Sequence, residues 1–170
     1  MNAFFVAAEF AIVKIRMSQI ETKANISPAL SKTAKVIVNH LDAHLAATQL
    51  GITLASLGLG WVGESSISPI IIKFFDLIGL SGPEYHSIAS TIAFWGSFAV
   101  ITVLHIVFGE LAPKSMAIRY PVNTTFAIAW PLRVFYIIFK PIIYLMNGFA
   151  NFFLNMIGFK PLEGARQAPA

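Results

Sequence analysis

Hydrophobic residues along this chain gather in long stretches, at about 44–62, 85–107 and 122–159. A helix needs roughly 20 consecutive, mostly apolar residues to cross the hydrocarbon core of a bilayer, and these stretches are about that long or longer. The chain is 56% hydrophobic and only 12% charged, whereas about a quarter of the residues of a soluble domain are charged. The pattern therefore predicts an all-α integral membrane protein.

The first apolar segment, residues 1–13, is shorter and is followed by Lys14. As a helix it covers about 20 Å, whereas the hydrocarbon core is roughly 30 Å thick. We therefore expect it to be the inner part of a first span that is truncated at its N-terminus. The polar and basic stretch 18–42, with a helix start at Ser27-Pro28, predicts an amphipathic helix on the cytoplasmic surface.

The second span, 44–62, carries two neighbouring stripes of small or polar residues. Ala47, Gly51 and Ala55 recur every four residues, a spacing that lets helices approach closely in lipid. The other stripe is polar or lacks a side chain, and consists of Gln49, Thr53, Ser56 and Gly60. We expect the first stripe to pack against another helix and the second to line a polar surface.

Residues 63–83 are expected to form an outer connection with a short interfacial helix at 70–80. The third span, 85–107, then returns the chain to the basic side at Lys114. Prolines and charges interrupt the last apolar region, 122–159, which predicts kinked helices that surround the core at the cytoplasmic interface.

The predicted fold is therefore all-α, with three transmembrane helices plus a juxtamembrane helical belt. It forms one transmembrane domain over residues 1–160, and residues 161–170 are expected to be a linker or remnant tail. The net charge is +4, from Lys and Arg residues spread over the segments next to the spans. Such residues favour the cytoplasmic side, which explains them better than nucleic-acid binding does. We expect a multi-pass protein of the cell membrane with a cytoplasmic C-terminus and no nucleic-acid partner.

The turn that ends the third span, from Phe108 to Lys114, is the strongest candidate for chemistry. Its Glu110 is a carboxylate in an apolar segment, where insertion scales assign a cost of roughly 2.5–3.5 kcal/mol at mid-depth, so it is a functional candidate. Pro113 has no N–H and cannot bond the carbonyl of Gly109, four residues earlier. A carboxylate and a freed carbonyl oxygen side by side predict a site for a hard cation.

Each acidic candidate also has a structural explanation. Glu110 can form an ion pair with Lys114, its neighbour one helical turn later, and Lys114 can serve as an anchor to lipid phosphate or neutralise the empty acid. Glu9, in the first segment, is either a cation ligand or gate, or a carboxylate paired with Lys14, Arg16 or another base near the cytoplasmic interface. We favour the cation site for Glu110 and leave both readings open for Glu9.

Several polar residues are weaker candidates. Gln49, Thr53 and Ser56 either contribute oxygens to a cation or bond across helices. His105 can act near the site or be a packed core residue, and a zinc site at His40 and His44 is unlikely without cysteine or an acidic cluster. The chain contains no phosphate-binding glycine loop, zinc-protease signature or nucleophile elbow, so we expect no enzymatic activity.

Three blocks of sequence, at 2–11, 47–64 and 108–115, together closely resemble the transmembrane domain of the CorC/cyclin-M family, whose bacterial members are called hemolysin-C-like. The resemblance covers the chain from Asn2 to about Pro161. It implies a homodimeric magnesium transporter, an exporter of Mg²⁺ coupled to Na⁺, with a helical belt. It also implies that cytoplasmic CBS modules that bind ATP follow this domain in the full-length protein.

The resemblance further implies that the ion is held between the spans by Glu110 and the Gly109 carbonyl. The position of a family asparagine is occupied here by Thr48-Gln49, and first-span hydroxyl positions by Val6 and Ala8, which cannot ligate.

We therefore expect Glu110, Gly109, Gln49, Thr48 and Thr53 to bind Mg²⁺, and Glu9, Ser56, Pro113 and Lys114 to line or gate the path. The alternatives are a magnesium-sensing scaffold that transports nothing and regulates other proteins, and a passive channel.

Overall fold

The computed structural model describes residues 1–77 and 83–158, without the side chains of 63–68, 71–72, 75–76 and 83–89. Within these residues every element is a helix, so the predicted all-α class is confirmed. Of the outer connection predicted at 63–83, residues 78–82 lie outside the described residues, as does the tail at 161–170.

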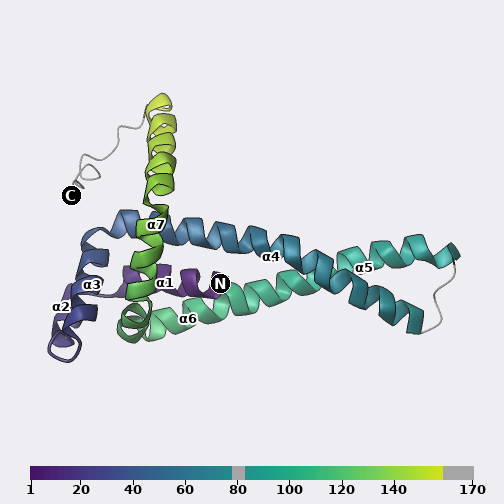
Figure 1. Cartoon of the computed structure of the whole chain (residues 1–170), viewed down its shortest axis with the longest axis horizontal. Coiled ribbons are helices and arrows are strands. Elements are labelled where there is room, and N and C mark those ends of the chain that lie inside the picture. Colours follow the sequence, from purple (N-terminus) through teal and green to yellow (C-terminus); the bar gives the residue numbers. More distant parts are fainter. Residues whose placement is uncertain (78–82, 159–170) are drawn as a thin grey trace.

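The first segment forms α1 (Asn2–Lys14), which packs among three other helices. Figure 1 shows it enclosed between α4, α6 and α7 near one end of the molecule. Its 13 residues are mostly apolar, and Ala8, Ala11 and Ile12 are almost fully buried. The predicted helix is confirmed, and it forms the centre of the packed region.

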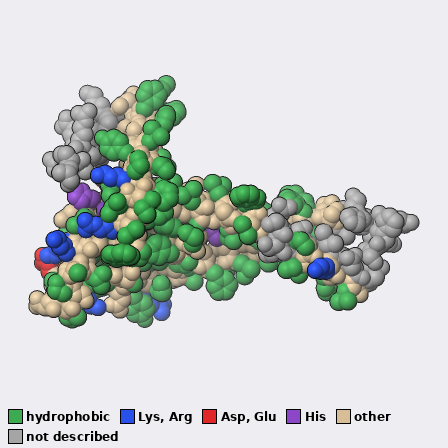
Figure 2. Space-filling view, in the orientation of Figure 1, with side chains coloured by type: hydrophobic (Ala, Val, Ile, Leu, Met, Phe, Trp, Pro, Cys, Tyr) green, Lys and Arg blue, Asp and Glu red, His purple; other side chains and the backbone are tan. Residues whose placement is uncertain are grey.

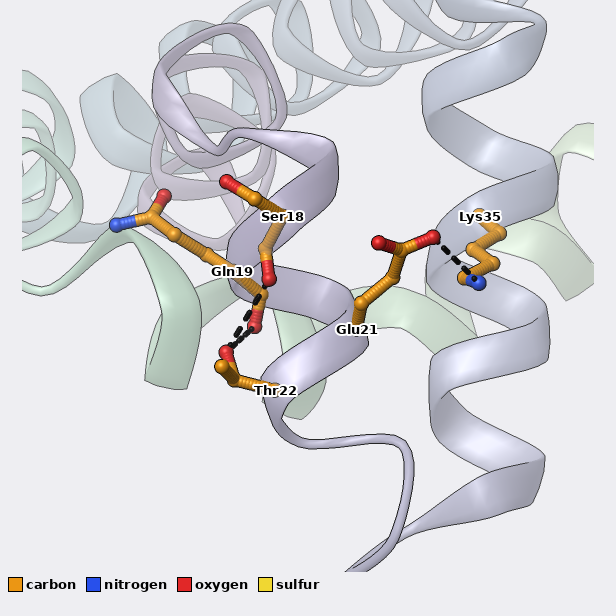
Figure 3. A network of polar contacts seen from close by, with 5 residues as sticks. All are labelled: Ser18, Gln19, Glu21, Thr22 and Lys35. Carbon is orange, nitrogen blue, oxygen red and sulfur yellow. Dashed lines mark hydrogen bonds and ion pairs between the residues drawn. The ribbon is translucent and has the colours of Figure 1, made fainter.

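The basic stretch that follows forms two helices instead of one, α2 (Met17–Thr22) and α3 (Pro28–Asn39), and α3 begins at the predicted proline. Figure 3 shows how α2 ends and how the pair is held. The Thr22 hydroxyl donates to the Ser18 and Gln19 carbonyls at 3.2 and 2.9 Å, and Lys35 bridges to Glu21 at 3.2 Å.

The second span continues further than the sequence predicts. It is part of α4 (Leu41–Leu77), one helix of 37 residues that includes Pro69, so the separate helix predicted at 70–80 is wrong. The proline and glycines weaken a helix in water. In apolar surroundings a helix is the conformation that bonds its own backbone groups, and this requirement outweighs their cost.

The third span is confirmed as α5 (Pro83–Leu104), which lies side by side with α4 in Figure 1. It continues through a π-helical turn, η1 (His105–Leu111), into α6 (Ala112–Arg119). The chain is therefore helical from α5 to Arg119 without a loop, and the candidate turn lies inside this rod.

The last apolar region forms one helix, α7 (Pro121–Met156), where several kinked helices were predicted. Pro131 and Pro141 lie within it without ending it. Figure 1 shows α7 running across the other helices, and it packs on α1, α3 and α4. A helix that crosses the others in this way fits the predicted belt, which here consists of α7 alone.

Among the described residues, three helical segments are long and apolar enough to cross a membrane, at 41–62, 90–119 and 121–156. The third of them is α7, while α1 is too short to qualify. Figure 2 shows hydrophobic side chains over most of the visible face, with most Lys and Arg groups near the end that carries α2 and α3. This distribution matches a membrane domain with one basic end.

The small stripe of α4 packs where predicted. Ala47 is fully buried, and a Cβ at Gly51 would overlap the ring of Phe5 from α1. Glycine therefore allows α1 to approach α4 at this point.

We predict that Gly51→Ala destabilises the protein by about 1–3 kcal/mol, because Phe5 must move in a packed core. Thermal unfolding in detergent measures the loss. Gly58→Ala is the matched control, since a Cβ there meets open space, and its midpoint should stay the same or rise. Equal midpoints for both variants would show that the α1–α4 contact does not depend on Gly51.

Candidate functional site

The turn singled out in the sequence has an unusual helical geometry. The Ala112 N–H bonds the carbonyl of Val107, five residues earlier, which is the spacing of a π-helix. Pro113 follows directly and has no N–H to donate. Turns of this kind leave backbone groups available to other partners, and they occur frequently at functional sites.

The Gly109 carbonyl in this turn faces the start of α1. Asn2 Nδ2 lies 3.4 Å from the Gly109 oxygen and 2.6 Å from Nε2 of His105. Asn2 is only 6% exposed, and its Oδ1 is buried with no hydrogen-bond partner among the described residues. A backbone carbonyl and the amide of a buried side chain are thus brought into contact by two segments far apart in the chain.

Glycine is needed at position 109 because the space around it is occupied. A Cβ there would lie 2.7 Å from His105 Cδ2, 3.2 Å from its Nε2 and 3.3 Å from Asn2 Nδ2. The first distance is too short for any real Cβ contact. The absence of a side chain therefore permits the Asn2 amide to reach the carbonyl.

A second polar group lies further along α1. Glu9 is seven residues after Asn2, which corresponds to about 10 Å along the helix. The Gln49 side chain and the Lys114 ammonium both lie near enough to Glu9 to act on its carboxylate. The ammonium also lies 4.4 Å from the centroid of the Phe10 ring. Lys14 and Arg16, the cations considered from the sequence, form no ion pair with Glu9 among the described residues.

Glu110 lies on the exposed side of the turn in the isolated chain. Among the described residues it forms no side-chain hydrogen bond and no ion pair, so the bond to Lys114 considered from the sequence is absent. Its carboxylate is adjacent in sequence to the Gly109 carbonyl and remains available to a cation or to another molecule.

The α4 candidates are distributed over different faces. The Thr48 hydroxyl is fully buried and donates to the Leu45 carbonyl at 2.8 Å, while the exposed Thr53 hydroxyl donates to the Gln49 carbonyl at 2.9 Å. A hydroxyl that donates its proton keeps lone pairs for a further partner. The structure therefore brings Gln49 to Glu9, and it does not gather both threonines at Gly109.

The polar stripe of α4 continues into a cavity of about 350 Å³ between α4 and α5. Ser56 and Gly60 line it from α4, and Thr102 and His105 from α5 and η1. His105 therefore touches the cavity on one side and Asn2 on the other. His105 is thus the residue that the cavity shares with the group around Gly109.

The sequence did not single out Asn2 and His105 as a pair. The one signal for the contact of Asn2 was its polar amide in an apolar segment, because a buried amide needs a hydrogen-bond partner. The described residues contain no cluster of three or more His, Cys, Asp or Glu that could hold a metal. A cation here would depend on neutral oxygens and single carboxylates, which suits Mg²⁺ better than softer metals.

Known proteins match the chain over its whole length. Residues 1–170 match the family model described as the cyclin M transmembrane N-terminal domain. The UPF0053 proteins YhdT and YrkA of Bacillus subtilis are 40% and 43% identical over 95% of this chain, which covers 34% and 36% of their lengths. The protein Rv1841c of Mycobacterium tuberculosis is 32% identical over 95% of the chain and 45% of its own length. The chain thus spans about a third of the two Bacillus relatives.

We predict that Asn2→Ala destabilises the protein by about 1–3 kcal/mol, because His105 and the Gly109 carbonyl lose a buried hydrogen-bond partner. Thermal unfolding in detergent measures the change. Asn39→Ala is the matched control, since Asn39 is exposed and no side-chain hydrogen bond is found for it. A loss no larger than that of the control would show that the contact contributes nothing.

Proposed function

This chain belongs to the cyclin M transmembrane-domain family, which is related to the transport of Mg²⁺ and other divalent cations, and we propose that it binds Mg²⁺ between its helices and carries it across the membrane by alternating access. One observation carries the proposal above all. The Gly109 carbonyl lies 3.4 Å from Asn2 Nδ2, and the Oδ1 of the same amide is buried and has no hydrogen-bond partner among the described residues. Both oxygens are available to an ion.

The ligand chemistry favours a hard cation. Mg²⁺ prefers six oxygens at about 2.0–2.1 Å and usually keeps several of its waters. Glu110 supplies the charge and Gly109 a carbonyl oxygen in this proposal, with neutral oxygens from Gln49, Thr48 or Thr53. Asn2 is an additional neutral ligand that the packing suggests. The few protein oxygens fit an ion that remains partly hydrated.

The residues around Glu9 are proposed to control access to the ion. Lys114 acts on the Glu9 carboxylate from α6, and Gln49 does so from α4. A cation that approaches Glu9 competes with the ammonium, so its arrival and the displacement of Lys114 are coupled. Ser56 lines the cavity that His105 also lines, and Pro113 is proposed to line or gate the path next to the Gly109 turn.

Export of Mg²⁺ needs a source of energy. Moving charge against the membrane potential costs about 2.3 kcal/mol per elementary charge per 100 mV. A Na⁺ gradient is the proposed source, and a homodimer in the cell membrane with a cytoplasmic C-terminus is the proposed form. ATP-binding CBS modules in a longer protein are also part of the proposal, and the chain spans about a third of its Bacillus relatives.

We predict that Mg²⁺ raises the thermal stability of the chain and that Glu110→Gln abolishes this effect. A ligand present at 100 times its Kd stabilises a protein by about 2.7 kcal/mol, so the loss is easily measured. Glu21→Gln is the matched control, because Glu21 is also an exposed carboxylate and its ion pair in the described part of the chain is with Lys35 of α3. The control should keep the full Mg²⁺ effect.

Flux into proteoliposomes separates transport from sensing. The proposal expects Mg²⁺ flux that depends on Glu110 and on a Na⁺ gradient. Binding without flux would instead support the magnesium-sensing scaffold, and flux that ignores Na⁺ would support a passive channel. If Glu110→Gln kept the full Mg²⁺ stabilisation, the carboxylate could not be a ligand.

A further inference from the structure

A groove of about 690 Å³ lies between α1, α6 and α7, and of the residues proposed for the ion path it includes Pro113. Its volume is within the range of ligand pockets, about 300–1,000 Å³. Its walls are mainly apolar and come from the first half of α1, the rod formed by η1 and α6, and the first turns of α7.

The groove has an apolar and a polar end. Along the rod its floor is formed by Phe108, Ala112, Met116 and Tyr120, which recur every four residues and therefore lie on one face. This row extends about 18 Å at 1.5 Å per residue. It begins beside the π-helical turn and ends at Tyr120, where Asn123 of α7 also lines the groove.

A positive charge lies at the polar end. Lys23 Nζ donates to Asn123 Oδ1 at 2.9 Å and lies 5.9 Å from the centroid of the Phe126 ring. Among the described residues Lys23 forms no ion pair. Its charge is therefore not neutralised by a carboxylate and can act on an anion at the end of the groove.

We propose that this groove binds an anionic phospholipid, with an acyl chain along the row from Phe108 to Tyr120 and the phosphate at Lys23, Asn123 and Tyr120. The direction of the groove matches the polarity of a lipid in its leaflet. The apolar end lies within the membrane-spanning segment 90–119, and the polar end lies at the basic end of the molecule. A free phosphate would leave the apolar length unused, and a zwitterionic lipid would bring its own cationic group to the end of the groove where Lys23 lies.

A photoactivatable phosphatidylglycerol with a diazirine in its acyl chain tests this site in phosphatidylcholine vesicles that contain the protein. Crosslinks should concentrate on Phe108, Ala112 and Met116. Lys23→Gln should reduce the crosslinking yield about five-fold, the effect of one Lys near an anionic surface. Lys32→Gln is its control, because it removes an equal charge from an exposed residue that does not line the groove.

A second pair of variants tests the shape of the groove without changing charge. Ala127→Phe fills the groove and should reduce crosslinking of the phosphatidylglycerol probe and of a phosphatidylcholine probe alike. Ala150→Phe, on an exposed part of α7 outside the groove, should change neither. Crosslinks spread evenly over exposed apolar residues such as Phe98 would show ordinary boundary lipid and overturn the proposal. A groove that neither lipid probe labels would overturn it as well.

Discussion

The missing N–H of Pro113 is the constraint on which the rest of the candidate site depends. A helix that runs through a proline leaves one carbonyl without its usual donor, and in lipid no water replaces it. Here the helix widens into a π-helical turn, and the Gly109 carbonyl turns to the side chain of Asn2. A defect in the hydrogen bonding of one helix thus becomes a polar contact between two helices.

The packing of α1 makes that contact possible. Gly51 lets the Phe5 ring approach α4, and Gly109 lets Asn2 approach the turn, so a glycine is needed on each side of α1. The same helix carries Glu9, which faces Gln49 and Lys114. The short first helix is therefore the element that gathers the polar groups of α4, η1 and α6, even though it contributes little of the membrane-spanning length.

The sequence could predict the features that depend on residues close together in the chain. The prediction that the Gly109 carbonyl is available rests on Pro113 alone, and the start of α3 follows from its proline. The Asn2–His105 contact joins residues 103 positions apart, so it depends on how α1 packs and no local pattern encodes it. The continuous course of α4 and α7 was missed for a related reason. The penalties of proline and glycine are local, whereas the need to bond the backbone in apolar surroundings applies to the whole segment.

The central claim is that the Gly109 carbonyl binds Mg²⁺, and the carbonyl itself can be observed. Labelling glycine with ¹³C at its carbonyl and glutamate with ¹⁵N gives NMR signals only for Gly-Glu pairs, and the chain has two, Gly63-Glu64 and Gly109-Glu110. Titration with Mg²⁺ should shift the Gly109 signal and leave the Gly63 signal in place as an internal control. A Gly109 signal that stays unmoved while Mg²⁺ stabilises the protein would contradict the account.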